Sequence, residues 1–328
     1  MKRIIALAAV LTLLLTMSIS TPVMAAPDTW YVDDDFGGGD FETISAAIDA
    51  ASPSDTIIVR EGEYHEQQLG ITKSNLTLTG EPGAILCGPG YEINEYGQPE
   101  GPEAIYVSPV ANSVTIEGLS FQDYRSAIVL DGSNDNLIQN NTLLTSELGN
   151  PHSFYDGINL ANAGNNQIIG NEVTDCEIDG IWLGPQCDEY GNRYGPGSNN
   201  NVVSGNVISG CHGGIILDFS HYNQVLWNTV SDSLYEPDPG CGIFIGVGAS
   251  YNLVNNNQIS NCGGGINLGY ALFNEITENT IGNSDTGICM GPDHTENGPS
   301  NNTIGDNHIS GCHVGMWLMN AQYNQVFK

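Results

Sequence analysis

The sequence is short of basic residues, since its 328 residues include only 7 Lys and Arg against 38 Asp and Glu. Two of the seven, Lys2 and Arg3, lie at the extreme N-terminus. The rest of the chain therefore has 5 basic residues against 38 acidic ones, a net charge of −33. Such an acidic surface repels nucleic acids and anionic membranes, so neither is expected as a partner. It also repels polyuronates unless a cation lies between the two charged partners.

Long apolar runs are also scarce. The N-terminal one, Ile4–Leu15, follows the basic start Lys2-Arg3 and precedes the small residues at Val23–Ala26. This order predicts a secretory signal peptide over residues 1–26. An uncleaved anchor is the alternative, although the run is shorter than the roughly 20 residues of a bilayer span. We expect no membrane span after cleavage. The chain is predicted to be secreted, extracellular or on the cell surface, and periplasmic if the host has an outer membrane.

Asparagine and glycine recur with a regular spacing. The stretch Asn252–Leu268 is the simplest copy of a repeat that combines two Asn residues with a Gly-Ile-x-Leu strand. The glycines of successive strands lie 23, 34, 28, 23, 22 and 28 residues apart, so the base period is 22 or 23 and the longer gaps contain insertions. A period of this size, built from short strands joined by Asn and Gly turns, predicts one coil of a parallel β-helix.

Two side-chain columns should accompany this stacking. The second Asn of each repeat is expected to point inward at a bend and to hydrogen-bond the coils above and below. These residues are Asn171, Asn206, Asn228, Asn257, Asn279 and Asn307. The residue before the first Asn is aromatic in four repeats, which predicts an aromatic stack. Its members are Tyr222, Tyr251, Phe273 and Tyr323.

The predicted domains follow the repeats. Residues 27–68 are expected to cap the N-terminal end, because Phe41–Ala51 has apolar residues at helical spacing and Thr56–Arg60 is a β-branched strand. Such a lid protects the open edge of a stacked sheet. The β-helix is expected over residues 69–328. Its last coil begins at Asn324 and is incomplete, so either the chain is a fragment or the open C-terminal end contacts a partner.

Particular motifs carry a family resemblance. The Asn-rich coil with Gly-Ile-x-Leu resembles the parallel β-helix repeats of the pectin-lyase-like superfamily, of the NosD type and the carbohydrate-binding and sugar hydrolysis type. The helix Thr43–Ala51, the strand Asp55–Val59 and the corner Gly62-x-Tyr64-x-Glu66 are similar to the N-terminal end of those proteins. The resemblance implies an all-β, single-stranded right-handed parallel β-helix. It leaves function open, because the superfamily includes lyases, hydrolases, esterases, epimerases, adhesins and inert scaffolds.

The outward face of the Gly-Ile-x-Leu strands is the candidate binding surface. Insertions flank these strands on both sides, and loops on a rigid scaffold commonly form binding sites. Trp182 and Phe244 share the central outward position and should lie about 10 Å apart, which suits stacking against successive sugar rings. The alternative is that a loop covers them. The predicted substrate-binding residues are Trp182, Phe244, Asn159, Tyr190 and Asn267.

Carboxylates beside this face are the candidate catalytic groups. Asp156 and Asp179 each precede the strand glycine in adjacent coils, so their backbones should lie about 5 Å apart. Two such carboxylates can share a proton, bind Ca²⁺ or act as an acid and nucleophile pair. Asp218 extends the same surface. The alternative is that all three are solvated turn residues.

Specific enzyme motifs and metal sites are missing. The polygalacturonase signatures do not occur, and none of Arg60, Arg125 and Arg193 lies in the context of a pectate lyase base. The pairs Cys211-His212 and Cys312-His313 should lie about 19 Å apart, too far to share an ion. No metal ligand is predicted, and Ca²⁺ in the acidic loops is the one cofactor that the composition suggests.

Three functions remain open from the sequence. The first is a secreted or cell-surface protein that binds polysaccharide along one sheet face. The second is a lyase, glycoside hydrolase or epimerase that uses Asp156, Asp179 or Asp218 on a poorly charged glycan. The third is a structural surface repeat without a ligand.

Overall fold

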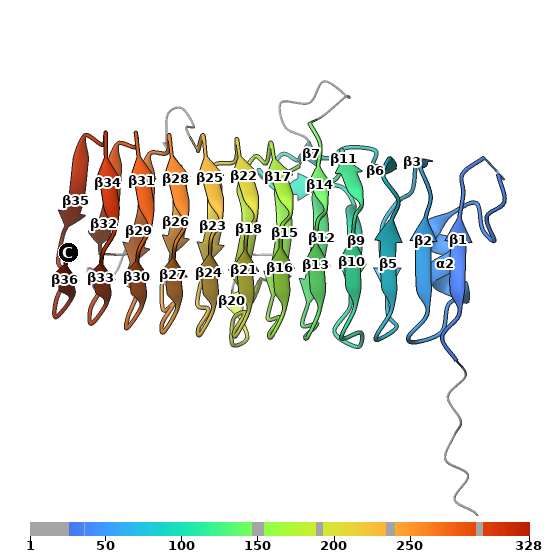
Figure 1. The fold of residues 1–328 in the computed structure, drawn as a ribbon, viewed down its shortest axis with the longest axis horizontal. Coiled ribbons are helices and arrows are strands. Elements are labelled where there is room, and N and C mark those ends of the chain that lie inside the picture. The colour runs from blue at the N-terminus through green and yellow to red at the C-terminus, as the bar shows by residue number, and fades with distance from the viewer. Residues whose placement is uncertain (1–25, 36, 146–153, 188–192, 234–239, 293–297) are drawn as a thin grey trace, which may run out of the picture.

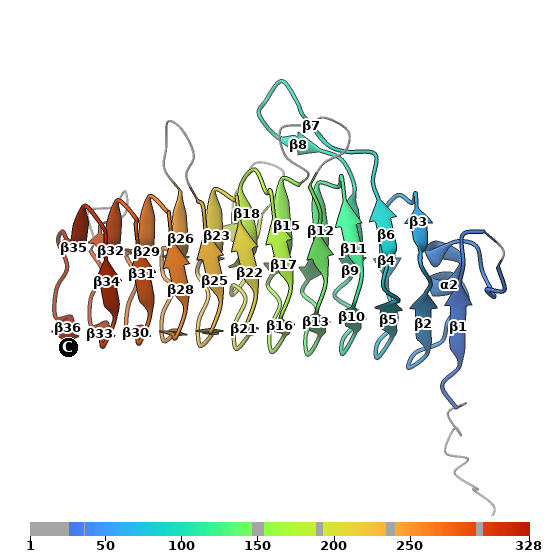
Figure 2. The same ribbon diagram turned by 45° about the horizontal axis from the view of Figure 1, so that its top comes forward.

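The computed structural model describes residues 26–35, 37–145, 154–187, 193–233, 240–292 and 298–328. In these residues the chain winds into successive coils, each formed by three short strands that pair in parallel with the equivalent strands of the next coil. Figures 1 and 2 show the resulting elongated stack of strands, with the single described helix at the N-terminal end. The predicted fold class, an all-β right-handed parallel β-helix, is confirmed.

Three long parallel sheets form the sides of the described β-helix. Sheet A contains β1 Thr29–Val32, β2 Thr56–Val59, β5 Thr77–Gly80, β10 Thr115–Glu117, β13 Leu137–Gln139, β16 Gln167–Ile169, β21 Val202–Ser204, β24 Gln224–Leu226, β27 Leu253–Asn255, β30 Glu275–Thr277, β33 Thr303–Gly305 and β36 Gln325–Phe327. Sheet B contains β3 Gly62–Tyr64, β6 Ala84–Cys87, β11 Ser120–Gln122, β14 Thr142–Leu143, β17 Glu172–Thr174, β22 Val207–Ser209, β25 Thr229–Ser231, β28 Gln258–Ser260, β31 Thr280–Gly282 and β34 His308–Ser310. Sheet C contains β4 Leu69–Ile71, β9 Glu103–Val107, β12 Ser126–Asp131, β15 Asp156–Ala161, β18 Asp179–Gly184, β23 Gly213–Leu217, β26 Cys241–Ile245, β29 Gly264–Gly269, β32 Thr286–Gly291 and β35 Val314–Leu318.

Two antiparallel hairpins lie outside these sheets. One is formed by β7 Glu92–Ile93 and β8 Pro99–Glu100, the other by β19 Gln186–Cys187 and β20 Arg193–Tyr194. Each hairpin falls within an insertion of the repeat, after β6 and after β18. The insertions therefore leave the pairing of consecutive coils intact, because their strands pair only with each other.

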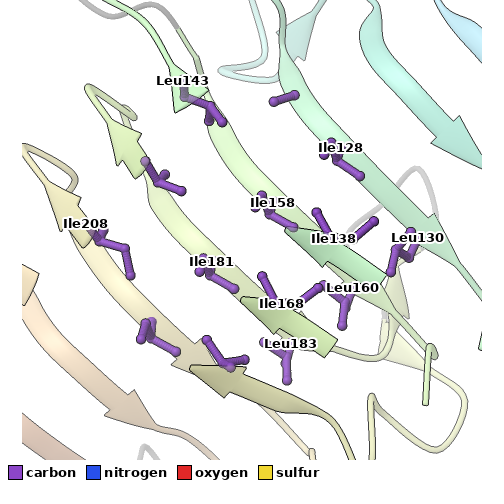
Figure 3. Close-up of a cluster of buried hydrophobic side chains, with 14 of the residues drawn as sticks. Ile128, Leu130, Ile138, Leu143, Ile158, Leu160, Ile168, Ile181, Leu183 and Ile208 are labelled. Atoms are coloured by element: carbon purple, nitrogen blue, oxygen red, sulfur yellow. The ribbon is translucent and has the colours of Figure 1, made fainter. Parts of the chain in front are cut away.

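The core is a set of apolar columns inside the coils. Successive side chains of a strand point to opposite faces, so one residue in two is buried. Ile158 pairs with Ile181 on sheet C and Ile138 with Ile168 on sheet A, and all four are fully buried. Figure 3 shows these side chains meeting between the sheets. The stacking of like residues on like residues explains why the Gly-Ile-x-Leu pattern recurs.

Two asparagine ladders occupy the bends. In the predicted ladder, Asn228 Oδ1 accepts from the backbone N–H of Asn206 at 3.0 Å and Asn228 Nδ2 donates to Asn257 Oδ1 at 3.0 Å. The first Asn of each repeat forms a second ladder, in which Asn223 Oδ1 accepts from the backbone of Asn201 at 2.8 Å. The ladder formed by the second Asn of each repeat is confirmed. The ladder formed by the first Asn of each repeat was not predicted.

The aromatic column is confirmed over three coils. The rings of Tyr222 and Tyr251 stack with centroids 5.2 Å apart, and those of Tyr251 and Phe273 stack at 5.1 Å. Asn301 occupies the next place in the column, so Tyr323 lies one coil beyond the stack. The prediction was therefore too long by one member, because an intervening coil carries a polar residue at this position.

The helix α2, Ile44–Ala50, lies at the N-terminal end of the stack and buries Ile44, Ala47 and Ile48 (Figure 1). The carboxylate of Glu66 accepts hydrogen bonds from the backbone N–H groups of Ile44 and Ser45, at 2.5 and 2.9 Å. The corner motif thus satisfies free donors of the first helical turn. Within the described residues, no helix is long and apolar enough to cross a membrane. The predicted signal peptide lies outside the described residues, apart from Ala26.

Candidate functional site

Two adjoining cavities form a groove on the outward face of sheet C. One has a volume of about 440 Å³ and lies over β12, β15 and β18, and the other has about 450 Å³ and lies over β18, β23 and β26. Both are lined by Asp179 and Trp182, so they form one continuous depression, called the groove below.

Residues before and after the strands form the two walls of the groove. Tyr155 and Ile178, which precede β15 and β18, line one side. Pro185, Gln186 and Tyr194, from the insertion that contains the β19–β20 hairpin, line the other. The expectation that insertions frame this face is therefore met on the side of β19–β20.

The strand register aligns one outward position from each coil along the groove. The residue that precedes the strand glycine is Asp156 in β15, Asp179 in β18, Gly213 in β23 and Cys241 in β26. Gly213 leaves room for its neighbour, because a Cβ atom at this position would lie 2.4 Å from Asp179 Oδ1. The carboxyl of Asp179 therefore extends over a coil that offers no side chain of its own.

Asp156 and Asp179 lie next to each other, as predicted. The backbone N–H of Asp179 donates to Asp156 Oδ1 at 3.3 Å. Burial raises the pKa of Asp156 to about 6, although this N–H and Arg125 favour its charged form. Burial, together with the charges of Asp156 and Asp218, raises the pKa of Asp179 well above its usual range. Burial thus favours the protonated form of both neighbouring carboxyls.

Asp218 lies on the same surface, but it is paired. Its Oδ2 forms a 2.6 Å ion pair with Arg193 Nη2, and the Asp218 side chain is only 6% exposed. The Arg193 guanidinium also lies 5.5 Å from the centroid of the Phe219 ring. Burial nevertheless raises the pKa of Asp218. Of the three predicted catalytic carboxylates, Asp218 is the one held by a basic side chain.

Arg125 and Glu103 at the other end of the groove were not identified from the sequence. They form an ion pair, and burial lowers the pKa of Arg125. Aligning Ala127-Ile128 with the Gly-Ile strands would have placed Ser126 beside Asp156 and Arg125 at the mouth of the groove. The signal was weak, since Ala replaces Gly in that coil.

Polar contacts along the β19–β20 wall were also missed. Asp131 accepts hydrogen bonds from the Tyr106 hydroxyl and from Gln186 Nε2. Burial, and then the proximity of Asp131, raises the pKa of Tyr106 to about 12. Gln186 also accepts from Asn162 Nδ2 at 3.1 Å. These bonds join β9, β12 and the hairpin, which fixes the width of the groove.

Trp182 and Phe244 occupy the central outward position, with Ile216 between them. Both aromatic side chains are half-buried, so they are neither fully covered nor fully exposed. Trp182 lies over Gly184, where an added Cβ would be 2.1 Å from its Cζ2 atom. Each ring therefore lies low on the sheet and retains some accessible surface in the groove.

The remaining predicted binding residues divide into two groups. Asn159 and Asn267 line the groove, and the Oδ1 atom of each is buried with no hydrogen-bond partner among the described residues. The Nε atom of Arg125 is likewise buried without a partner there. Tyr190 lies outside the described residues. Two buried acceptors and one buried donor beside this groove thus have no hydrogen-bond partner among the described residues.

A metal centre does not emerge from the described part of the chain. Its one group of at least three His, Cys, Asp or Glu side chains with ligand atoms within 4.8 Å of one another is Asp33, Asp34 and Asp35. This group lies after β1 in the cap, and Arg60 forms a 2.9 Å ion pair with Asp33. The expectation of Ca²⁺ in the acidic loops stays a prediction.

Comparison with known proteins gives one family and several solved structures with a similar fold. The family model described as "Periplasmic copper-binding protein (NosD)" matches residues 48–190, 103–236 and 155–328. No curated protein matches the chain.

Similar solved structures include "Geobacillus virus E2 - ORF18", with a TM-score of 0.66 and 14% identity over 91% of this chain and 60% of that one. A DFA-IIIase from Arthrobacter chlorophenolicus A6 in complex with GF2 has a TM-score of 0.60 and 12% identity over 86% of this chain and 87% of that one. The pectate lyase Pel9A has a TM-score of 0.57 and 12% identity over 90% and 78%. The chain thus spans 60% of the viral protein's length, and likeness at these identities shows the fold alone.

Proposed function

The chain belongs to the family described as periplasmic copper-binding protein (NosD), and from this premise we propose that it is an exported β-helix protein whose groove binds a glycan. The observation that carries the proposal is a half-buried tryptophan, Trp182, in a groove that is also lined by carboxyl and amide groups. Aromatic faces offer a flat apolar surface and polar edges beside them accept hydrogen bonds, a combination that suits a sugar ring.

The charge of the groove narrows the class of glycan. Five carboxyl groups line it, against two arginines that each have an ion-pair partner. An anionic sugar would bring further negative charge to this site. The ligand is therefore a neutral or positively charged saccharide that extends along sheet C over several coils, rather than a polyuronate.

Removing one ring tests the binding proposal. We expect Trp182→Ala to weaken binding of the best oligosaccharide on a glycan array by at least about tenfold, because burying one large aromatic surface contributes about 1.5–3 kcal/mol. Trp227→Ala is the matched control, since Trp227 is 60% exposed after β24 and does not line the groove. If calorimetry gives the same affinity for the oligosaccharide in both variants, the groove is not the binding site.

Copper, which the family description names, does not fit the described side chains. Protein copper sites use imidazole, thiolate and thioether ligands. The one clustered group, Asp33 to Asp35, offers carboxylates only. The Cys176 thiol is buried, and burial raises its pKa, which disfavours the thiolate that binds metal. No step of the proposed function therefore involves copper.

A second candidate function, hydrolysis of a glycosidic bond, is favoured by the paired carboxyls Asp156 and Asp179. Glycosidases use one protonated carboxyl and one carboxylate. Here Asp179 would give its proton to the glycosidic oxygen as the C–O bond breaks, and ionised Asp156 would add to the anomeric carbon. Water would then displace Asp156 from that carbon and lose a proton to Asp179, as expected for two carboxyls on adjacent coils. Reducing ends released by the native protein but not by Asp179→Asn would support this activity. Full binding without release would leave the groove as a binding site.

A further inference from the structure

We infer that the groove selects a saccharide with a protonated amine, which would lie between Asp156 and Asp179. This inference rests on the glycan binding proposed above and specifies its ligand class. It follows from the charges of the groove side chains, from their hydrogen-bonding capacity and from the space available to a ligand.

The charge of the groove is negative and only partly neutralised. Arg125 pairs with Glu103, and Arg193 pairs with Asp218. Within the described residues, no ion pair reaches Asp156 or Asp179, which lie between these two pairs along the sheet. A cationic group placed there would find two carboxyls that no basic side chain of the described residues pairs with directly.

The hydrogen-bonding capacity points in the same direction. An ammonium group has three donors and no acceptor. The carboxyl oxygens of Asp156 and Asp179 accept hydrogen bonds, and the buried Oδ1 atom of Asn159, which pairs in register with Trp182, lacks a partner in the described chain. Arg125 Nε is the one unpartnered buried donor of the groove in the part of the chain that the structure describes, so acceptors outnumber donors at this surface.

The space beside Asp179 fits an organic cation better than a metal ion. Gly213 has no side chain, so the Asp179 carboxyl borders the open part of the groove. The described groove carboxylates do not form a group with three ligand atoms within 4.8 Å of one another, which a bound metal ion would favour. Trp182 lines the same space and gives the ring that bears the amine a surface on which to stack.

The protonation of Asp179 should then change on binding. The groups that influence or face it are Asp156, Asp218, Tyr155, Cys241, Arg193 and His212. Burial and two neighbouring carboxylates raise the pKa of Asp179, which favours the neutral form of its carboxyl. A bound ammonium reverses this preference, because a positive charge nearby stabilises the carboxylate. Binding should therefore release protons from the Asp156 and Asp179 pair to solvent.

A pair of matched oligosaccharides tests the inference. A fully deacetylated β-1,4-glucosamine oligomer and its fully N-acetylated counterpart of equal length are titrated into the full protein by calorimetry. The titrations are made at about pH 5.5, where an amine is protonated, in two buffers of different ionisation enthalpy. We expect the deacetylated oligomer to bind at least about tenfold tighter, as for a charged hydrogen bond, and to release about one proton.

Two variants and one non-sugar cation control for general attraction to an acidic protein. Asp179→Asn should weaken the preference and reduce the proton release, since Asp156 remains beside the bound amine. Asp306→Asn, which removes an exposed carboxylate outside the groove, should leave both unchanged. Spermine should bind at least about tenfold more weakly than the deacetylated oligomer, because it has no ring to stack on Trp182.

The outcomes separate this inference from the proposed function. Equal or tighter binding of the N-acetylated oligomer would overturn the amine preference and leave the glycan groove standing. Spermine binding as tight as that of the sugar, or equal losses in Asp179→Asn and Asp306→Asn, would also overturn it, since nonspecific attraction would then explain the data. No binding of either oligomer, together with an empty glycan array, would refute both.

Discussion

Replacing Asp156 with asparagine should stabilise the protein at neutral pH. Burial raises the pKa of Asp156 from an ordinary value of 3.8 to about 6, so folding favours its protonated form. A carboxyl with a raised folded pKa contributes stability at low pH and loses it as the pH rises through the folded pKa. Above about pH 6 the folded protein must hold a half-buried charge that the unfolded chain holds in water.

The size of the effect follows from the pKa shift. Each pKa unit corresponds to about 1.4 kcal/mol of folding free energy, so the pKa shift of Asp156 sets an upper limit of about 3 kcal/mol on the gain in stability. Partial exposure of the side chain to solvent reduces this gain to roughly 1–2 kcal/mol. The amide oxygen of the substituted asparagine would still accept the hydrogen bond from the backbone N–H of Asp179. The variant should therefore gain stability without losing a contact.

Urea denaturation between about pH 4 and pH 8 measures this effect. The difference between Asp156→Asn and the native protein should be near zero at about pH 4 and should grow until about pH 7. Asp306→Asn is the control, because its exposed carboxylate should give a flat difference. A native protein that is as stable as Asp156→Asn at pH 7, or more so, would refute the argument that burial of this charge costs stability.

Three further predictions concern the scaffold. Asn228→Ala should lower the free energy of unfolding by roughly 3–5 kcal/mol, because it leaves the backbone N–H of Asn206 and further buried groups without partners. Faster hydrogen exchange of the Asn206 amide would support this prediction, and an unchanged exchange rate would contradict it. Gly180→Ala should cost about 1–3 kcal/mol in urea denaturation, since its Cβ would lie 2.6 Å from Ile208 Cγ2; a loss below about 0.5 kcal/mol would show that the coil relaxes. Tyr251→Ala removes the middle ring of the exposed aromatic stack and should cost about 1 kcal/mol or more, whereas an unchanged thermal midpoint would mean that the stacked rings contribute nothing.

The scaffold could be predicted from the sequence because each inward residue repeats. An inward Ile, such as Ile158, contacts an equivalent residue of the next coil, so the same physical constraint acts once in every coil. The Asn bends obey the same rule, since each amide bonds to the amide one coil away. The second ladder was missed, although its residues repeat as regularly, because only one Asn of each repeat was assigned an inward direction.

The site was less predictable because its contacts are not periodic. The register alone predicted that Asp156 lies next to Asp179, and the structure places them so. The pairing of Asp218 with Arg193 depends on the β19–β20 insertion, whose path no repeat dictates. The pairing of Arg125 with Glu103 depends on a coil in which the strand glycine is replaced. Contacts formed once in the molecule leave no pattern in the sequence.

The location of the groove follows from where outward residues depart from the repeat. The residues that pair in register with Asp156 and Asp179 along sheet C form a column, called the carboxylate column. The simplest coil, around β29, places Gly264 in this column and has no insertion between its strands. Coils at β32 and β35 place Thr286 and Val314 in that column. Among the described coils, only at β15 and β18 do carboxyls in this column, the aromatic ring of Trp182 and the inserted wall coincide. Because the inward ladders hold every coil in the same geometry, these outward positions can differ without loss of the fold. A ligand that requires all three features is therefore expected to bind across β15 and β18.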